Sequence, residues 1–184
     1  VIPKFTQFTI NSKKFFNRDN IVFPAGVIAV GKAHIYDSTV PDVLLYEGEV
    51  KTKSYSSDTT QFREIYLEEN GFNVSDEDVQ VKITNVIQNV NEVWSRTRNG
   101  NAIWTADPGE KVYYDSTSGL GDTIITFGDG SRGAVPPLGS SIDITYAITS
   151  GSAGNFGTSN IEVKSVADGD ITGSTVEIIK GGSD

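Results

Sequence analysis

The stretch from Thr126 to Asn155 limits the possible folds of this chain most strongly, because strand-forming residues there are interrupted by dense turn signals. Apolar residues up to Phe127 lead into Gly128-Asp129-Gly130. The Asp-Gly pair predicts a two-residue hairpin turn, because glycine adopts a positive φ without steric strain. Pro136-Pro137-Leu138-Gly139 predicts a second turn, in which proline fixes φ and glycine follows.

The strand after this proline corner is the clearest in the chain. Apolar residues occupy every second position from residue 142 to residue 148, and a second alternating run covers residues 79–83. A period of two is typical of a strand that is buried on one face. These runs predict a core that includes Phe127, Ile142, Ile144, Tyr146, Ile148, Val79, Val81 and Ile83.

Turn signals recur about every eight to twelve residues, which favours an all-β chain with a sandwich-like or barrel-like main domain. A polar stretch near residue 55 predicts a boundary after a small N-terminal β-region. The acidic run 74–78 predicts a connection between strands. The predicted domains are residues 1–55 for the N-terminal region, 56–157 for a β-sandwich-like main domain, and 158–184 for C-terminal strands.

Composition narrows the function classes. The net charge is −9 and cysteine is absent, so a nucleic-acid partner is disfavoured and neither a disulfide nor a thiolate metal site can form. His34 is the only histidine, which rules out a histidine-rich zinc site. No apolar run approaches the roughly 20 residues that span a bilayer. We therefore predict no cofactor, no metal, no nucleic-acid partner and no membrane partner.

Catalytic patterns are equally scarce. The sequence holds neither the G-x-S-x-G elbow of hydrolases nor a phosphate-binding loop. A calcium loop beginning at Asp168 would need a closing glutamate where Ile179 stands. A glycosidase would need two carboxylates about 5 to 10 Å apart, which a sequence cannot place. No catalytic residue and no small-molecule substrate is predicted.

Aromatic residues leave one binding alternative open. A platform of aromatic rings can stack on sugars, although aromatic residues of β-proteins more often lie in the core or at interfaces. The candidate platform residues are Trp94, Trp104, Tyr113, Tyr114 and Tyr146.

The ordered pattern of the central stretch resembles the baseplate-J and baseplate-wedge proteins of contractile-tailed phages. The pattern is F-G-D-G, a glycine, P-P-x-G, an alternating I-x-I-x-Y strand and G-x-x-G-N. The matching positions are Phe127, Gly128, Asp129, Gly130, Gly133, Pro136, Pro137, Gly139, Ile142, Ile144, Tyr146, Gly151, Gly154 and Asn155.

This resemblance implies a structural, non-enzymatic subunit of a tail baseplate or of a related injection machine. It implies contacts with other copies of the chain and with other wedge and hub proteins, assembly in the host cytoplasm and a final place in the virion. It also implies that C-terminal helices follow in the longer protein. A carbohydrate-binding or adhesin module is the alternative, and a glycosidase is the third hypothesis.

Overall fold

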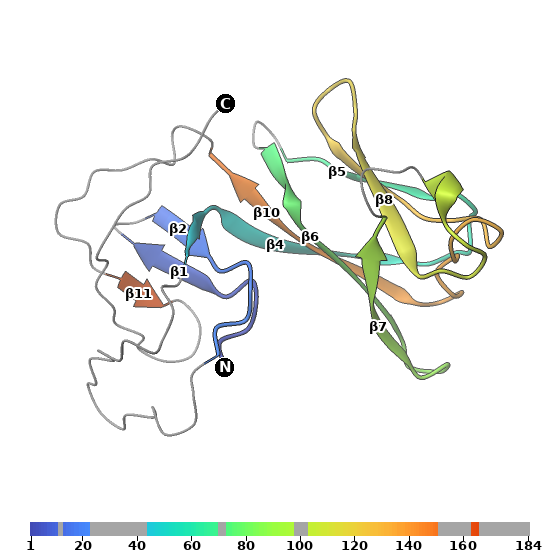
Figure 1. Ribbon diagram of the computed structural model, residues 1–184, viewed down its shortest axis with the longest axis horizontal. Coiled ribbons are helices and arrows are strands. Elements are labelled where there is room, and N and C mark those ends of the chain that lie inside the picture. The colour runs from blue at the N-terminus through green and yellow to red at the C-terminus, as the bar shows by residue number, and fades with distance from the viewer. Residues whose placement is uncertain (11–12, 23–43, 70–72, 98–102, 151–162, 166–184) are drawn as a thin grey trace. The chain divides into compact units, whose positions relative to one another are not determined.

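The computed structural model describes residues 1–10, 13–22, 44–69, 73–97, 103–150 and 163–165 (Figure 1). The described part is almost entirely β, which confirms the predicted fold class. The chain divides into two compact units, residues 1–50 with 149–184 and residues 51–148. We call them the first unit and the second unit.

The first unit is built on a four-stranded sheet in the order β11-β1-β2-β3. Phe8 and Phe15 face each other across the antiparallel β1–β2 pair and form a small core. Phe16 is fully buried, and the centre of its ring lies 6.1 Å from the centre of the Tyr46 ring. The strands are β1 (Gln7–Ile10), β2 (Lys13–Phe16), β3 (Tyr46–Glu47) and β11 (Val163–Ser165).

The first unit combines residues 1–50 with residues 149–184, whereas the sequence predicts separate regions for residues 1–55 and 158–184. The strand β11 pairs with β1 through partners such as Phe8 and Ser165, so this strand belongs to the N-terminal sheet. Pairing between distant segments leaves no mark in a local pattern, and for this reason the sequence did not indicate it.

The second unit is one curled seven-stranded sheet in the order β4-β10-β6-β7-β8-β9-β5, where the sequence predicted a sandwich-like arrangement. β4, β10 and β6 are long strands that run side by side (Figure 1). The β7–β8 pair is parallel. The strands are β4 (Glu49–Ser56), β5 (Glu64–Leu67), β6 (Asn73–Asn85), β7 (Val90–Arg96), β8 (Val112–Thr117), β9 (Thr123–Thr126) and β10 (Ser141–Thr149).

Alternation explains the core of the second unit. Every second residue of β10 from Ile142 to Ile148 is buried, because consecutive strand residues face opposite sides of a sheet. All eight predicted core residues belong to one buried cluster, together with side chains from β5, β7, β8 and β9, so the prediction is confirmed. The prediction that the acidic run 74–78 connects two strands is wrong, because the run lies inside the long strand β6.

Candidate functional site

The predicted motif forms a folded corner after β9. Phe127 is fully buried and packs edge-on against Trp94, with the ring centres 5.7 Å apart. The Phe127 amide donates to the Arg63 carbonyl at 3.1 Å, and the Phe62 amide donates to the Gly128 carbonyl at 3.1 Å. These bonds continue the β5–β9 ladder beyond both strands, so the motif begins as an extension of the sheet.

Gly128 and Gly133 make the closest backbone approach of the corner. A Cβ atom on Gly128 would lie 2.2 Å from the carbonyl oxygens of both Arg132 and Gly133. Gly133 has a φ of +71°, and a Cβ there would lie 3.0 Å from Cδ1 of Ile103. Ile103 belongs to the short 3-10 helix η2 (Ile103–Thr105). Only glycine fits at position 128, because Cβ atoms do not approach backbone oxygens this closely.

Asp129 organises the loop between these two glycines. Its Oδ1 atom accepts hydrogen bonds from the amides of Ser131 at 2.9 Å and Arg132 at 2.7 Å. Short polar side chains stabilise turns in this way, by satisfying amides two and three residues further on. Gly130 has the predicted positive φ, +92°, and a Cβ there would meet nothing within 4 Å.

The predicted two-residue hairpin at Asp129-Gly130 is wrong, although the φ of Gly130 is as expected. No returning strand follows directly: β9 pairs with β5 and β8, and the next strand begins only at Ser141. The intervening backbone bonds to other segments instead. The amides of Gly133 and Ala134 donate to the carbonyls of Asp107 and Glu110, at 3.1 Å and 2.7 Å. Proline cannot donate to a ladder, which disfavours a strand over Pro136 and Pro137.

The proline corner is tied to the loop after β4 and to the end of β6. The Ser57 hydroxyl donates to the Pro136 carbonyl at 2.7 Å, and the Gly139 amide donates to the Ser57 carbonyl at 3.1 Å. The buried Asn85 amide group donates to the Leu138 carbonyl at 3.0 Å and to the Ser140 hydroxyl oxygen at 3.2 Å. Gly139 has a φ of +72°, so the turn residue has the conformation that glycine favours.

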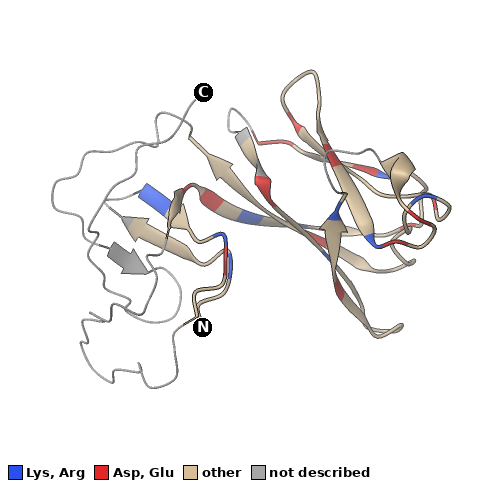
Figure 2. Cartoon of the chain, in the orientation of Figure 1, with Lys and Arg blue, Asp and Glu red and all other residues tan. Residues whose placement is uncertain are grey.

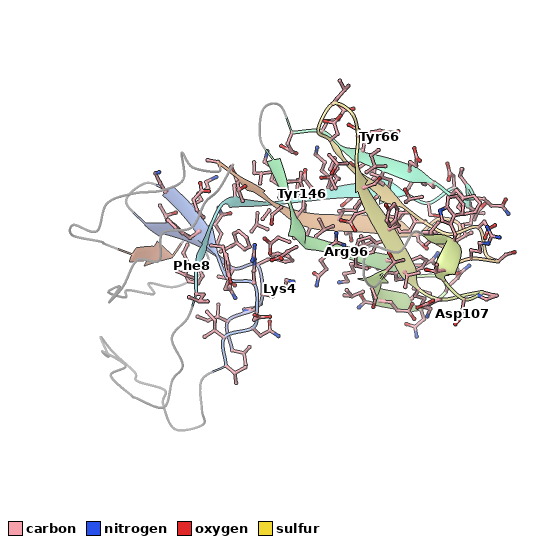
Figure 3. All side chains as sticks on the ribbon, turned by 45° about the horizontal axis from the view of Figure 1, so that its top comes forward. Lys4, Phe8, Tyr66, Arg96, Asp107 and Tyr146 are labelled. Atoms are coloured by element: carbon pink, nitrogen blue, oxygen red, sulfur yellow. The ribbon has the colours of Figure 1, made fainter. Side chains whose placement is uncertain are left out.

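Tyr146, which Figure 3 labels, connects the motif to a polar cluster. Its hydroxyl donates to the Glu69 carboxylate, which also pairs with Lys51 and, at 2.9 Å, with Lys53. The two lysines come from β4, and Glu69 lies two residues after the end of β5. Because β4 and β5 are the two edges of the curled sheet, this cluster joins the edges through side chains.

The electrostatics of the cluster follow from its burial and its bonds. Burial acts to raise the pKa of Glu69, but hydrogen bonds from Lys51, Tyr146 and Lys53 outweigh it and lower that pKa to about 2. Burial, together with the bond to Glu69, raises the pKa of Tyr146 to about 12. The pKa of Lys53 is raised: burial opposes this shift, and hydrogen bonds to Glu69 and Tyr146 outweigh burial. These shifts favour the charged forms of Glu69 and Lys53, so the pair forms an ionic link over the ordinary pH range.

The sequence did not indicate the partners of the motif. Ser57, Glu69 and Asn85 lie 79, 77 and 53 or 55 positions from the motif-region residues that they bond. One weak signal was available: Lys51, Lys53 and Tyr55 occupy alternate positions of one strand and share a face. Gly151, Gly154, Asn155 and His34 lie outside the described residues.

The aromatic residues of the alternative hypothesis are not gathered on one surface. Trp94, Tyr113 and Tyr146 are buried in the core of the second unit. Burial raises the pKa of Tyr113 to about 12, and its hydroxyl donates to the Val79 carbonyl at 3.0 Å. Trp104 is 57% exposed and contacts Phe62, with ring centres 5.3 Å apart. Of the five candidates, Trp104 is the most exposed to solvent.

Among the described residues, no group of three or more His, Cys, Asp or Glu side chains is placed to hold a metal ion. The helical part of the described chain contains no segment of the length and hydropathy that a membrane-spanning helix needs. The motif residues that the structure describes form turns, close packing and hydrogen bonds.

Comparison of the chain with family models, with curated proteins and with solved structures gives no match.

Proposed function

We propose that this chain is a structural subunit of a contractile-tail baseplate wedge, or of a related injection machine, and acts through protein–protein contacts. The proposal starts from the ordered resemblance between Phe127 and Asn155. It is supported by the use that the fold makes of the described motif positions. Each of them serves packing or chain reversal, as expected of a pattern that specifies a scaffold.

The observation that carries most weight is the contact between Gly128 and Gly133. A Cβ on Gly128 would overlap two carbonyl oxygens at 2.2 Å, so the first glycine of F-G-D-G is a stereochemical requirement. The requirement exists only because Gly133 returns to that point. The spacing between the two glycines is therefore a property of one folded corner in this chain.

Rigidity is what a wedge subunit needs from such a corner. The corner ties together the loop after β4, the end of β6 and the segment 103–110 through the bonds described above. The Glu69 cluster links the two edge strands of the same sheet. A stiff β-scaffold can hold partners on its different sides at fixed positions, as a symmetric assembly such as a baseplate requires.

The test is co-expression of the full chain with the proteins encoded beside it in its genome. We expect the chain to co-purify in a defined complex with other copies of itself or with neighbouring wedge and hub proteins. Electron microscopy of particles that carry a labelled chain should place the label at the tail baseplate. A chain that stays separate from all of these proteins, and is missing from the particles, would overturn the proposal.

A carbohydrate-binding module is the second candidate, and one observation favours it. Trp104 presents an exposed ring beside Phe62, and exposed aromatic rings can stack on sugars. A glycan array with the wild-type chain and with Trp104→Ala separates the two candidates. Binding that disappears in the variant would favour this module over the scaffold.

A further inference from the structure

The β6–β7 hairpin ends in a turn whose two apolar side chains are almost fully exposed. Val86 is 90% exposed and Ile87 is 97% exposed. Leu138, on the adjoining proline corner, is 65% exposed, and its carbonyl accepts a hydrogen bond from Asn85, the last residue of β6 before the turn. Turns are normally formed by Gly, Pro, Asn, Asp and Ser. We call Val86, Ile87 and Leu138 the apolar tip.

Hydrogen bonds hold the backbone of the turn that carries Val86 and Ile87. The Gln88 amide donates to Asn85 Oδ1 at 3.0 Å, and the Asn89 amide donates to the Val86 carbonyl at 3.4 Å. The same Asn85 side chain is buried and bonds the proline corner. Groups that are already ordered lose little conformational entropy on binding, so the tip is prepared for a contact.

The two segments that carry the apolar tip contain no charged residue. Residues 83–91 and 133–142 include no Asp, Glu, Lys or Arg, although 21% of the chain is charged. Figure 2 shows the end of the β6–β7 hairpin, at the lower right, in the colour of uncharged residues. The centres of protein interfaces are depleted of charged residues in the same way. A charge-free apolar projection is complementary to a charge-free apolar pocket.

Charge decides between the possible occupants of the apolar tip. A membrane surface attracts basic segments, and this tip has no Lys or Arg while the chain carries a net charge of −9. Any stable interface takes roughly 800 Å² from each partner, more than three side chains supply, so the tip can form only part of a larger contact. Equal charges also oppose the approach of two copies. The tip is therefore suited to anchor a larger contact with a different protein.

We propose that the apolar tip inserts into an uncharged apolar pocket on a different protein of the same assembly. The inference rests on the proposed function for the choice of that assembly. The tip alone supplies the anchor, and other surfaces supply the rest of the contact area. Residues that fill such pockets carry most of the binding energy of an interface.

Photo-crosslinking tests the proposal in the full chain. A benzophenone amino acid replaces Ile87, and the chain is co-expressed with the proteins encoded beside it. The matched control carries the same probe at Leu120, which is 92% exposed in the β8–β9 turn. We expect the probe at residue 87 to crosslink to an apolar, uncharged segment of a different chain, and the control to miss that segment.

Affinity then measures the contribution of the tip. The double substitution Val86→Ser with Ile87→Ser should weaken binding of the crosslinked partner at least tenfold by calorimetric titration. Leu120→Ser should change it less than twofold. Both variants should keep the wild-type circular dichroism and unfolding midpoint, because the changed side chains are exposed.

Several results would overturn the proposal: a crosslink to a second copy of the chain, no crosslink from residue 87, or co-sedimentation with phosphatidylcholine–phosphatidylglycerol vesicles that depends on Val86 and Ile87. A complex that forms without a crosslink at residue 87 refutes the tip and leaves the wedge function standing. A specific crosslink to an apolar pocket of a protein outside the tail keeps the pocket insertion, but refutes the shared assembly and the wedge function.

Discussion

The substitution Gly128→Ala tests the central corner most directly, because it adds a single carbon atom at the closest backbone approach. That atom would lie 2.2 Å from the carbonyl oxygens of Arg132 and Gly133. Both oxygens already accept hydrogen bonds, from the Asp129 amide at 3.3 Å and from the Gly130 amide at 2.9 Å. Neither oxygen belongs to a flexible side chain, so relief requires the backbone to move.

The expected loss of stability has two parts. Movement of the 132–133 backbone breaks the two hydrogen bonds, which contribute about 1 kcal/mol each. Forcing an additional carbon into a packed site costs about 1–3 kcal/mol. We therefore expect Gly128→Ala to lower the free energy of unfolding of the second unit by about 3–5 kcal/mol.

Urea unfolding followed by tryptophan fluorescence measures this loss. The chain has two tryptophans, Trp94 and Trp104, and both lie in the second unit, so the signal reports that unit. The matched control is Gly130→Ala, where a Cβ meets nothing within 4 Å and the strain comes from φ alone. A positive φ costs an alanine about 1–2 kcal/mol. If Gly128→Ala were no more destabilising than Gly130→Ala, the close approach would be refuted.

Three further changes test the second unit. The pKa of Glu69 is lowered, so its contribution to the free energy of unfolding is complete above pH 4.5 and is lost as the pH falls toward 2. Glu69→Gln should lower the free energy of unfolding at pH 7 by at most about 3 kcal/mol. The urea midpoints of the variant and the wild type should converge near pH 2. A constant difference across this range would contradict the ionic link. Asn85→Ala removes the bonds to Leu138, Ser140 and Gln88 and should cost about 2–3 kcal/mol in the same assay. Phe127→Ala leaves a cavity beside Trp94 and should cost about 3–5 kcal/mol with a shift in tryptophan emission; an unchanged emission would refute that contact.

The local patterns of the sequence were sufficient for the fold class and for most of the core of the second unit. Strict alternation in β10 predicted which side chains are buried, because a strand's two faces are set by the period of two. The positive φ of Gly130 followed from turn chemistry. The acidic run 74–78 misled because its charges suggested a loop, whereas β6 continues through it, with the Ser75 hydroxyl donating to buried Asp78 at 2.6 Å.

The arrangement of the corner could not be predicted, because its decisive contacts join distant segments. The sequence showed that Gly128 and Gly133 are glycines, but not that their backbones touch. It showed Lys51 and Lys53 on one strand, but not that both pair with Glu69, which follows the strand at the other edge of the sheet. Strand order and sheet curvature determine both contacts, and neither property has a local signal.

Asn85 connects the corner to the apolar tip, and this separates their roles experimentally. Its Nδ2 group donates to the proline corner, and its Oδ1 atom accepts from the Gln88 amide within the hairpin turn. Loss of Asn85 should therefore weaken both folding and partner binding, since the corner loses its bonds and the tip loses its support. Val86 and Ile87 make no such bonds through their side chains, so their substitution should weaken binding alone. A variant of these two residues that destabilises the fold as much as Asn85→Ala would show that the apolar side chains support the hairpin, and the tip would then be structural.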